Sequence, residues 1–301
     1  MSRRRAASLS AALLVVGGLL LGACGDPDQE PPADPGAQRD RAIHAGDRYV
    51  ALGDSYTAAY KTGKTDKASG PCLRSLANYP RLLADKLDLE LTDVSCGGAT
   101  SDAALSPQRK EGGSVIPAQI EAVTKDTDLV TISMGSNDVD LYGAIIGGCV
   151  ELAAGDPSGS PCTDLARQNE VKGKRDLRNV ENSLTSIIRA VAAKAPQARV
   201  VLVGYPQSFP SDKPCANLPI ARGDVPFAFQ AARDVTDVLA SAAKEEGVEY
   251  VDVWSATQGH DVCSKDPWIA GAHPRRRDGF AYHPFPEEQR AVADLLVATL
   301  S

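Results

Sequence analysis

The sequence predicts an α/β fold in which helices cover both faces of a central parallel sheet of about five strands, a three-layer α/β/α sandwich. Two observations predict it. Short β-rich runs alternate along the chain with segments of helical periodicity. Runs such as Val200–Val203 are apolar at every position, as a strand covered on both faces requires.

Five strands are expected from these runs, and the second has the weakest β-forming composition. They are Arg48–Leu52, Leu91–Ser95, Leu129–Ser133, Arg199–Val203 and Glu249–Val253. These strands alternate with helical segments along the chain, and no linker interrupts the series. We therefore expect a single domain over residues 48–301.

Three helices are indicated by apolar residues that recur on one face. Their apolar stripes are Val180, Leu184, Ile187, Ile188 and Val191; Val235, Val238, Leu239 and Ala242; and Val292, Leu295, Leu296 and Thr299. The first ends before Ala195-Pro196, the second near Gly247, and Pro286 opens the third. The polar segment between Gly147 and Arg178 is expected to be a surface loop, with a lid over the active site as the alternative.

The N-terminus predicts export. Residues 1–24 combine Arg3, Arg4 and Arg5 with a short apolar run, as in a signal peptide. The run ends in Leu21-Gly22-Ala23-Cys24, which resembles a bacterial lipobox, so we expect acylation of Cys24 and a cell-surface lipoprotein. Ordinary cleavage near Ala23, giving a secreted protein, is the alternative. Residues 25–47 have almost no large apolar side chain and are expected to be a disordered tether.

Composition narrows the partners. The net charge is −7 and no basic stripe with interleaved aromatic residues is present, so nucleic-acid binding is not expected. Contact with a membrane is expected only through the lipid anchor, and we expect a monomer. Six cysteines remain besides Cys24, none in a zinc-binding spacing, so disulfides are expected, with about 15 connectivities allowed.

Polar and glycine-rich segments follow the predicted strands, where ligands bind in an open α/β sheet. They are Gly53–Thr57 after the first strand, Cys96–Thr100 after the second, Met134–Asp138 after the third, and the long loop to His283-Pro284 after the fifth. Each segment alone is a weak signal. Their convergence on one edge of the sheet is what predicts an active site.

The residue types at this edge suit acyl transfer. A serine hydroxyl needs an adjacent base to act as a nucleophile, which predicts Ser55 as nucleophile and His283 as base. Gly98 and Asn137 are candidates for the oxyanion hole, with the N–H of Ser55 as a further donor. A helix N-cap for Ser55 and turn positions for Gly98 and Asn137 are the structural alternatives. Asp54 is expected to be structural.

Four histidines compete for the role of base: His44, His260, His273 and His283. His273-Pro274 repeats the dipeptide at His283-Pro284 and is the main rival. We favour His283 because a helix begins just after it and holds it against the sheet. Arg275, Arg276 and Arg277 are expected to form a solvated loop.

The four segments resemble the blocks of the SGNH (GDSL-type) hydrolases, named for Ser, Gly, Asn and His. The likeness covers residues 48–301 and is closest to secreted actinobacterial lipases and esterases, which have similar Cys72–Ser75, Asn78–Pro80 and Gly204–Pro206 segments. The resemblance implies a cofactor-free and metal-free esterase with a flavodoxin-like α/β/α fold. It also supports sequential disulfides, Cys72–Cys96, Cys149–Cys162 and Cys215–Cys263, which close the shortest loops.

One departure from the family concerns the acid of the triad. The family has an aspartate three residues before the histidine, where this chain has Phe280. Asp278 would reach His283 only if the loop bulges, so we favour a backbone carbonyl, from Phe280 or Ala281, as the group that orients His283.

The expected substrates are acyl esters of lipids or short-chain esters. The residues expected to line an apolar groove for the acyl chain are Tyr142, Ile145, Ile146, Trp254 and Trp268. Packing in the core is an equal alternative for them. A carbohydrate acetyl esterase and a non-catalytic surface lipoprotein are the rival functions.

Overall fold

Five parallel strands form the central sheet in the order β2-β1-β5-β6-β7. They are β1 (Arg48–Gly53), β2 (Glu90–Asp93), β5 (Leu129–Ser133), β6 (Arg199–Val203) and β7 (Glu249–Val251). The computed structural model describes residues 41–274 and 279–301, which belong to one compact unit. The predicted α/β fold and its five strands are therefore confirmed. The predictions for residues 1–40, Cys24, Arg275–Arg277 and Asp278 lie outside the described residues.

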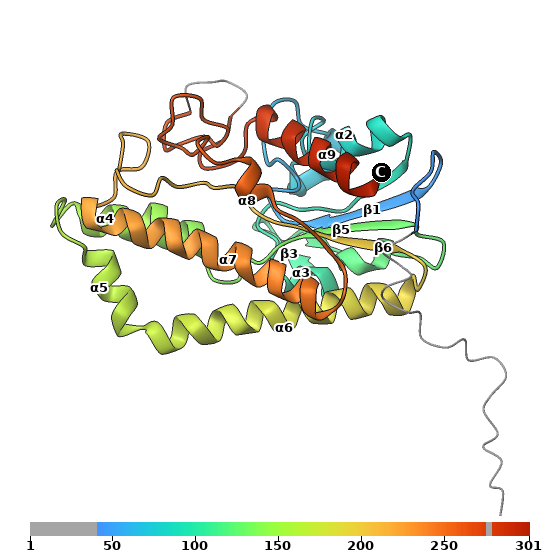
Figure 1. Ribbon diagram of the computed structural model, residues 1–301, viewed down its shortest axis with the longest axis horizontal. Coiled ribbons are helices and arrows are strands. Elements are labelled where there is room, and N and C mark those ends of the chain that lie inside the picture. Colours follow the sequence, from blue (N-terminus) through green and yellow to red (C-terminus); the bar gives the residue numbers. More distant parts are fainter. Residues whose placement is uncertain (1–40, 275–278) are drawn as a thin grey trace, which may run out of the picture. The chain divides into compact units, whose positions relative to one another are not determined.

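Helices cover both faces of the sheet (Figure 1). The helices α2 (Tyr79–Leu87), α8 (Val253–Ala256) and α9 (Pro286–Leu300) lie on one face, and α6 (Glu170–Lys194) and α7 (Val225–Glu245) on the other. The alternation of strand side chains produces this layering. In β1, Tyr49 and Ala51 belong to the core under α2 and α9, whereas Val50 and Leu52 face α6 and α7.

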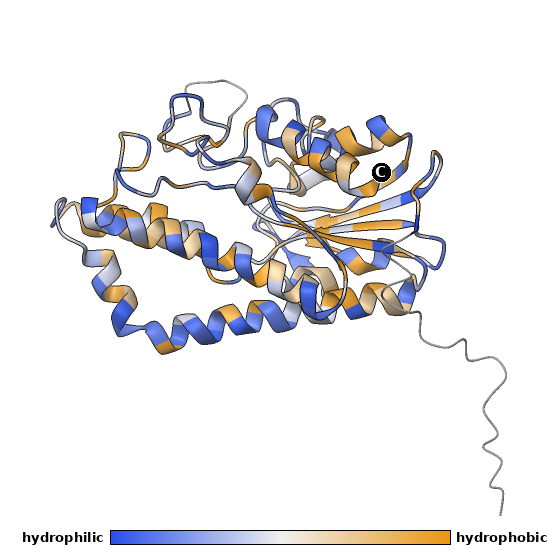
Figure 2. Cartoon of the chain, viewed as in Figure 1, coloured by the Kyte–Doolittle hydropathy of each residue, from blue (hydrophilic) through white to orange (hydrophobic). Residues whose placement is uncertain are grey.

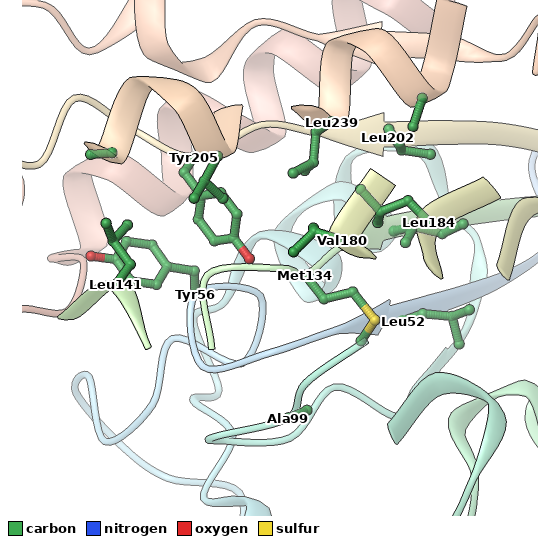
Figure 3. Packing of buried hydrophobic residues seen from close by; sticks show 14 of the residues in the cluster. Leu52, Tyr56, Ala99, Met134, Leu141, Val180, Leu184, Leu202, Tyr205 and Leu239 are labelled. Carbon is green, nitrogen blue, oxygen red and sulfur yellow. The ribbon is translucent and has the colours of Figure 1, made fainter. Parts of the chain in front are cut away.

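The larger core reaches the carboxyl end of the sheet. Figure 3 shows Leu52 and Met134 near the strand ends, with Val180 of α6 and Leu239 of α7 close by. All four side chains are buried. This apolar packing fixes the ends of β1 and β5, from which two of the predicted active-site loops start.

The predicted surface loop between Gly147 and Arg178 is wrong, because most of it is helical. It contains the end of a π-helix, η3 (Gly143–Cys149), then α4 (Val150–Ala153), α5 (Pro161–Gln168) and the first turns of α6. Figure 2 shows α5 and the start of α6 as largely hydrophilic. The pairs Glu170–Lys174 and Lys172–Asp176, each four residues apart, support this polar helix, which has little apolar periodicity to predict it.

The start of α5 is fixed to the domain from two sides. The Cys149–Cys162 disulfide joins it to η3. Asp224, which is buried at the end of η4 (Arg222–Asp224), accepts hydrogen bonds from the N–H groups of Cys162 (3.0 Å) and Thr163 (2.8 Å). A carboxylate at this position satisfies free N–H groups of the first turn, so Asp224 caps α5 from a distant part of the chain.

Short elements surround the carboxyl edge of the sheet. They are η1 (Lys67–Cys72), α3 (Asp102–Leu105), η2 (Gln119–Ala122), and a hairpin of β3 (Gln108–Arg109) with antiparallel β4 (Val115–Ile116). The three sequential disulfides, Cys72–Cys96, Cys149–Cys162 and Cys215–Cys263, are all present. Across the described ranges, helices are too short or too polar to span a membrane, and no cluster of three or more His, Cys, Asp or Glu side chains offers a metal site.

Candidate active site

A cavity of about 590 Å³ lies at the carboxyl ends of the strands. Ser55, Gly98, Asn137 and His283 all contribute to its wall, although they come from four different loops. The structure therefore brings together the four residues that the sequence singled out. They lie far apart along the chain and meet, as predicted, because parallel strands end at the same edge.

The loop that carries Ser55 is held by a buried carboxylate next to it. Asp54 is fully buried and accepts hydrogen bonds from the hydroxyls of Tyr205 (2.6 Å) and Ser136 (3.1 Å) and from the N–H of Tyr56 (2.8 Å). Burial raises the pKa of Asp54 to about 6, and the three donors act against that rise. Asp54 thus ties the end of β1 to the loops after β5 and β6 and has the structural role expected for it.

A second side chain fixes the end of β1. Gln119 of η2 is buried and brackets Gly53, accepting from its N–H (2.8 Å) and donating to its carbonyl (2.9 Å). Both backbone groups of Gly53 are satisfied, and Ser55 follows two residues later, 9% exposed at the cavity wall. The nucleophile candidate therefore stands on a backbone that buried polar groups hold in place.

Gly98 adopts a left-handed backbone conformation, with φ at +70°, in a loop that is anchored on both sides. The Cys72–Cys96 disulfide precedes it, and the N–H of Gly97 donates to the carbonyl of Cys72 (3.3 Å). Within residues 41–274 and 279–301, the N–H groups of Ser55 and Gly98 have no hydrogen-bond acceptor. Two unpaired N–H donors at one cavity suit the binding of an oxyanion.

Asn137 lines the cavity beside the Gly98 loop. Its side-chain amide donates one hydrogen bond to the carbonyl of Ala99 (2.9 Å), which leaves the second amide hydrogen for another acceptor. The next residue, Asp138, accepts hydrogen bonds from the N–H (2.9 Å) and the hydroxyl of Ser101. Asn137 and Asp138 therefore join the loop after β5 to the loop after β2.

The ring of His283 is oriented by a backbone carbonyl. Its Nδ1 lies 2.8 Å from the carbonyl oxygen of Ala281. The carbonyl of Phe280 instead accepts the backbone N–H of His283 (3.0 Å), so the alternative naming Phe280 is corrected in favour of Ala281. Tyr282, with φ at +58°, forms the turn between them. Burial, together with the nearby charge of Lys61, lowers the pKa of His283 to about 4.

Aromatic rings surround the imidazole. The ring centroids of Tyr56, Tyr60 and Phe280 lie 5.8, 5.6 and 5.1 Å from that of His283. The ammonium of Lys61 lies over the Phe280 ring, 4.8 Å from its centroid. These contacts restrict the imidazole and reduce its hydration, which explains its low pKa.

The other histidines lie elsewhere. His273, the rival base, is exposed and does not line the cavity. His260 stacks on Trp268 with ring centroids 3.8 Å apart, and the side chain of His44 is largely exposed beside Asp47. Among the described histidines, His283 is the one that the fold brings to Ser55.

The predicted acyl groove does not coincide with the cavity, because none of its five residues lines it. Ile145 and Trp254 are buried in the core, and Tyr142 stacks on Tyr56 at a centroid distance of 5.4 Å. Core packing, the alternative reading, holds for these three. The other side chains that line the cavity were not predicted: Tyr60, Pro71 and Leu73, with Gln108, Arg109, Lys110 and Glu111 of the β3–β4 hairpin. The Gly112-Gly113 pair is the sequence signal for that hairpin.

Comparisons with known proteins agree with this geometry. Residues 51–284 match the model of the GDSL-like lipase/acylhydrolase family. Lipase 2 of Streptomyces coelicolor is 39% identical over 225 residues, which are 71% of this chain and 72% of that protein. The crystal structures of phospholipase A1 from Streptomyces albidoflavus and of the extracellular lipase from Streptomyces rimosus each match with a TM-score of 0.68.

These two structures are 26% and 27% identical to this chain; they are matched over their whole length and cover 85% and 84% of it. The family match spans most of the described domain, from β1 to the residue after His283. This chain belongs to the GDSL-like lipase/acylhydrolase family and is a carboxylic ester hydrolase.

Proposed function

We propose that the protein is an exported esterase that hydrolyses acyl esters, including lipid esters, with Ser55 as nucleophile and His283 as general base. The observation that carries the proposal is the common cavity, to which four separate loops bring Ser55, His283, Gly98 and Asn137. Each of these residues has a plausible structural role alone. Their meeting at one open surface is expected for a nucleophile, a base and two oxyanion donors.

The base is in the tautomer that this chemistry requires. The carbonyl of Ala281 can only accept, so the Nδ1 of His283 carries the ring proton and Nε2 keeps a free lone pair. With its pKa lowered to about 4, the imidazole is neutral at pH 7 and able to take the proton of Ser55. A carbonyl thus performs the orienting part of a triad acid without adding a negative charge.

The reaction would proceed in two steps. Ser55 Oγ attacks the ester carbonyl carbon as His283 takes the hydroxyl proton, and His283 then returns that proton to the leaving alcohol. A water molecule next gives a proton to His283 and attacks the acyl carbon, and His283 returns that proton to Ser55 Oγ as the bond to Ser55 breaks and the carboxylic acid leaves. The oxyanion of both tetrahedral states would be bound by the N–H groups of Ser55 and Gly98 and by Asn137.

The cavity supports an acyl ester as substrate. Tyr60, Pro71 and Leu73 supply apolar surface, which suits an acyl chain next to the reacting carbonyl. The relatives named above include a lipase and a phospholipase A1. Export is supported by the signal-like N-terminus and by the three disulfides, which persist in oxidising compartments. Acylation of Cys24 would anchor the enzyme at the cell surface.

Mutation of the two predicted catalytic residues tests this function. The purified protein is assayed with p-nitrophenyl esters of increasing chain length and with acetylated xylan. We expect hydrolysis of the acyl esters, and losses on the order of 10⁴-fold or more in Ser55→Ala and His283→Ala. His273→Ala is the matched control, since it changes the exposed histidine of the same His-Pro dipeptide, and should retain activity.

A serine-reactive organophosphate gives an independent readout. It should add one phosphoryl group to the peptide that contains Ser55, and Ser55→Ala should prevent the labelling. Full activity in Ser55→Ala would exclude the proposed mechanism, and hydrolysis confined to acetylated xylan would replace the acyl-ester substrate with a carbohydrate ester.

A further inference from the structure

We propose that Lys110 is a positioning residue for the oxyanion hole, because its ammonium group holds and polarises the peptide that joins Gly97 to Gly98. The carbonyl of this peptide belongs to Gly97 and accepts a hydrogen bond from Lys110 Nζ. The N–H of the same peptide belongs to Gly98 and is the proposed oxyanion donor. The inference rests on the proposed function and assigns a task in it to a residue from a separate hairpin.

The β3–β4 hairpin fixes the position of Lys110. The strands pair Gln108 with Ile116 and Arg109 with Val115. Beyond them, the N–H of Lys110 donates to the carbonyl of Ser114 (2.9 Å), and the carbonyl of Lys110 accepts from Gly113 (3.1 Å). Both backbone groups of Lys110 are therefore engaged in the turn, and its side chain leaves a defined base to reach Gly97.

The Gly97–Gly98 peptide is held from several sides. Gln108 from the same hairpin donates a longer hydrogen bond to the carbonyl of Gly97 (3.4 Å), and the N–H of Gly97 donates to Cys72. The ring of Tyr60 lies against Gly97, where a Cβ atom would come within 2.3 Å of it. A Cβ atom on Gly98, by contrast, would meet Lys110 Nζ only at 3.9 Å. Gly98 therefore faces the open cavity with the ammonium beside it.

A cation on a peptide carbonyl strengthens the N–H of the same peptide. The amide is a conjugated unit, so electron density drawn toward the carbonyl oxygen makes the N–H a better donor, and hydrogen-bond chains strengthen in this way. The effect is largest when the acceptor becomes an anion, as it does in the tetrahedral state. The positive charge itself also lies near the developing oxyanion.

The surroundings of Lys110 indicate that this contact is its main engagement. The side chain is half-buried, and no carboxylate within the described part of the chain lies within 4.0 Å of its nitrogen. The loss of hydration lowers the pKa of Lys110, and the charge of Glu111 acts in the opposite direction.

The experiment compares four variants of the full-length mature protein on a soluble short-chain p-nitrophenyl ester. Lys110→Met removes the charge and the donor, Lys110→Gln keeps a neutral donor, and Lys110→Arg keeps a charged donor. Arg109→Met removes the same charge from the adjacent position of the hairpin, which also lines the cavity but donates no hydrogen bond to Gly97. The melting temperature and the disulfide-linked peptides of each variant show whether the fold is intact.

We expect Lys110→Met to lower kcat about tenfold with KM within about twofold, a smaller loss than the roughly 100- to 1000-fold expected for removing an oxyanion donor itself. The affinity for butylboronic acid, which forms a tetrahedral adduct with the active serine, should fall by a similar factor. Lys110→Arg should restore most of kcat, Lys110→Gln should be intermediate, and Arg109→Met should lose less than Lys110→Met.

The proposal is overturned if Lys110→Met changes only KM, if Lys110→Arg is no better than Lys110→Met, or if Arg109→Met has an equal effect on kcat. If Lys110→Met does not fold, the comparison of Lys110→Gln with Lys110→Arg decides by the same criteria. Failure here is distinguishable from failure of the proposed function, because Ser55→Ala would still abolish hydrolysis. If Ser55→Ala is active, the proposed function itself fails.

Discussion

The loop of Ser55 and the loop of His283 meet at one cavity but are held by different kinds of interaction. Buried side chains fix the Ser55 loop: Asp54 gathers three donors, and Gln119 brackets Gly53. The His283 loop is held mainly through its backbone groups, including the carbonyls of Tyr282 and Pro284, which accept from the hydroxyls of Tyr56 (2.9 Å) and Thr62 (2.8 Å). The carbonyl of His283 accepts a hydrogen bond from the N–H of Ala270 (2.9 Å), and the N–H of Tyr282 donates to the carbonyl of Ala270 (3.0 Å).

The contrast follows from the position of each loop in the fold. Ser55 follows β1, an interior strand between β2 and β5, where side chains from neighbouring segments can satisfy each polar group. His283 lies on a long excursion before α9, where a short antiparallel bridge, Ile269 with Pro284, supplies the order. Substitutions of the side chains that hold the Ser55 loop should therefore lower stability strongly. Changes to carboxylates near His283 should have little effect on stability or activity.

The largest effect is expected for the disulfide next to the Gly98 loop. Replacing Cys72 and Cys96 by serine should lower the free energy of unfolding by about 2–5 kcal/mol. Hydrolysis should fall as well, because Gly98 follows Cys96 by two residues. Urea unfolding and kcat at a temperature where the variant is folded measure the two effects. The Cys149–Cys162 pair is the control, since its removal should affect stability with little change in kcat.

Removing the buried carboxylate should come next. Asp54→Ala leaves Tyr205, Ser136 and the N–H of Tyr56 without their acceptor, at a cost of about 3 kcal/mol in the free energy of unfolding. Asp126→Ala, which changes an exposed carboxylate, should stay within about 0.5 kcal/mol of the parent protein. If denaturant titrations showed equal losses of stability for Asp54→Ala and Asp126→Ala, the hydrogen bonds of Asp54 would not stabilise the fold more than a surface carboxylate does.

The His283 side can be tested through pH. Because burial lowers its pKa to about 4, the neutral base persists well below the ordinary histidine range. We expect kcat/KM to fall as the pH decreases through about 4, where protonation removes the free lone pair on Nε2. Product formation from a soluble ester, measured by chromatography between pH 3.5 and 8, gives the profile. A fall centred near 6.5 would contradict the buried position of the imidazole.

A further pH effect should appear in stability. Glu288 at the start of α9 is buried, with Gln289 as its hydrogen-bond partner, and burial raises its pKa to about 8. The unfolded chain loses this proton at lower pH than the folded one, so the free energy of unfolding should decrease as the pH rises toward 8. Denaturant titrations at pH 5 and pH 8 measure this change, and Glu288→Gln should make the difference between the two free energies of unfolding smaller. An unchanged difference would contradict the role of Glu288.

The smallest effect is expected for Asp278→Asn. The carbonyl of Ala281 already orients the imidazole, so kcat/KM should change by less than about threefold, against the roughly 10⁴-fold loss known for a true triad aspartate. Steady-state kinetics on one ester is sufficient. A loss near the larger value would mean that a carboxylate, and not only the backbone, supports His283.

Much of this architecture could be predicted from local patterns. Apolar runs located the five strands, and the residues after them identified Ser55, Gly98, Asn137 and His283, because parallel strands carry their ends to one edge. Prediction failed where spatial context decides. Trp254 looked suited to a groove but is 2% exposed in the core, and nothing in the sequence placed Lys110 beside Gly97. The start of α6 has polar side chains whose helical ion pairs leave no apolar period.

The Cys72–Cys96 bridge makes the position of the loop before Gly98 depend on a step that follows synthesis. It joins the end of η1 to the residue two places before Gly98, so a covalent bond formed after synthesis holds the loop that carries the proposed oxyanion donor. A newly made chain with both thiols still reduced has all four loops but lacks this junction. We therefore expect a chain with these two thiols reduced to hydrolyse esters more slowly than the oxidised chain.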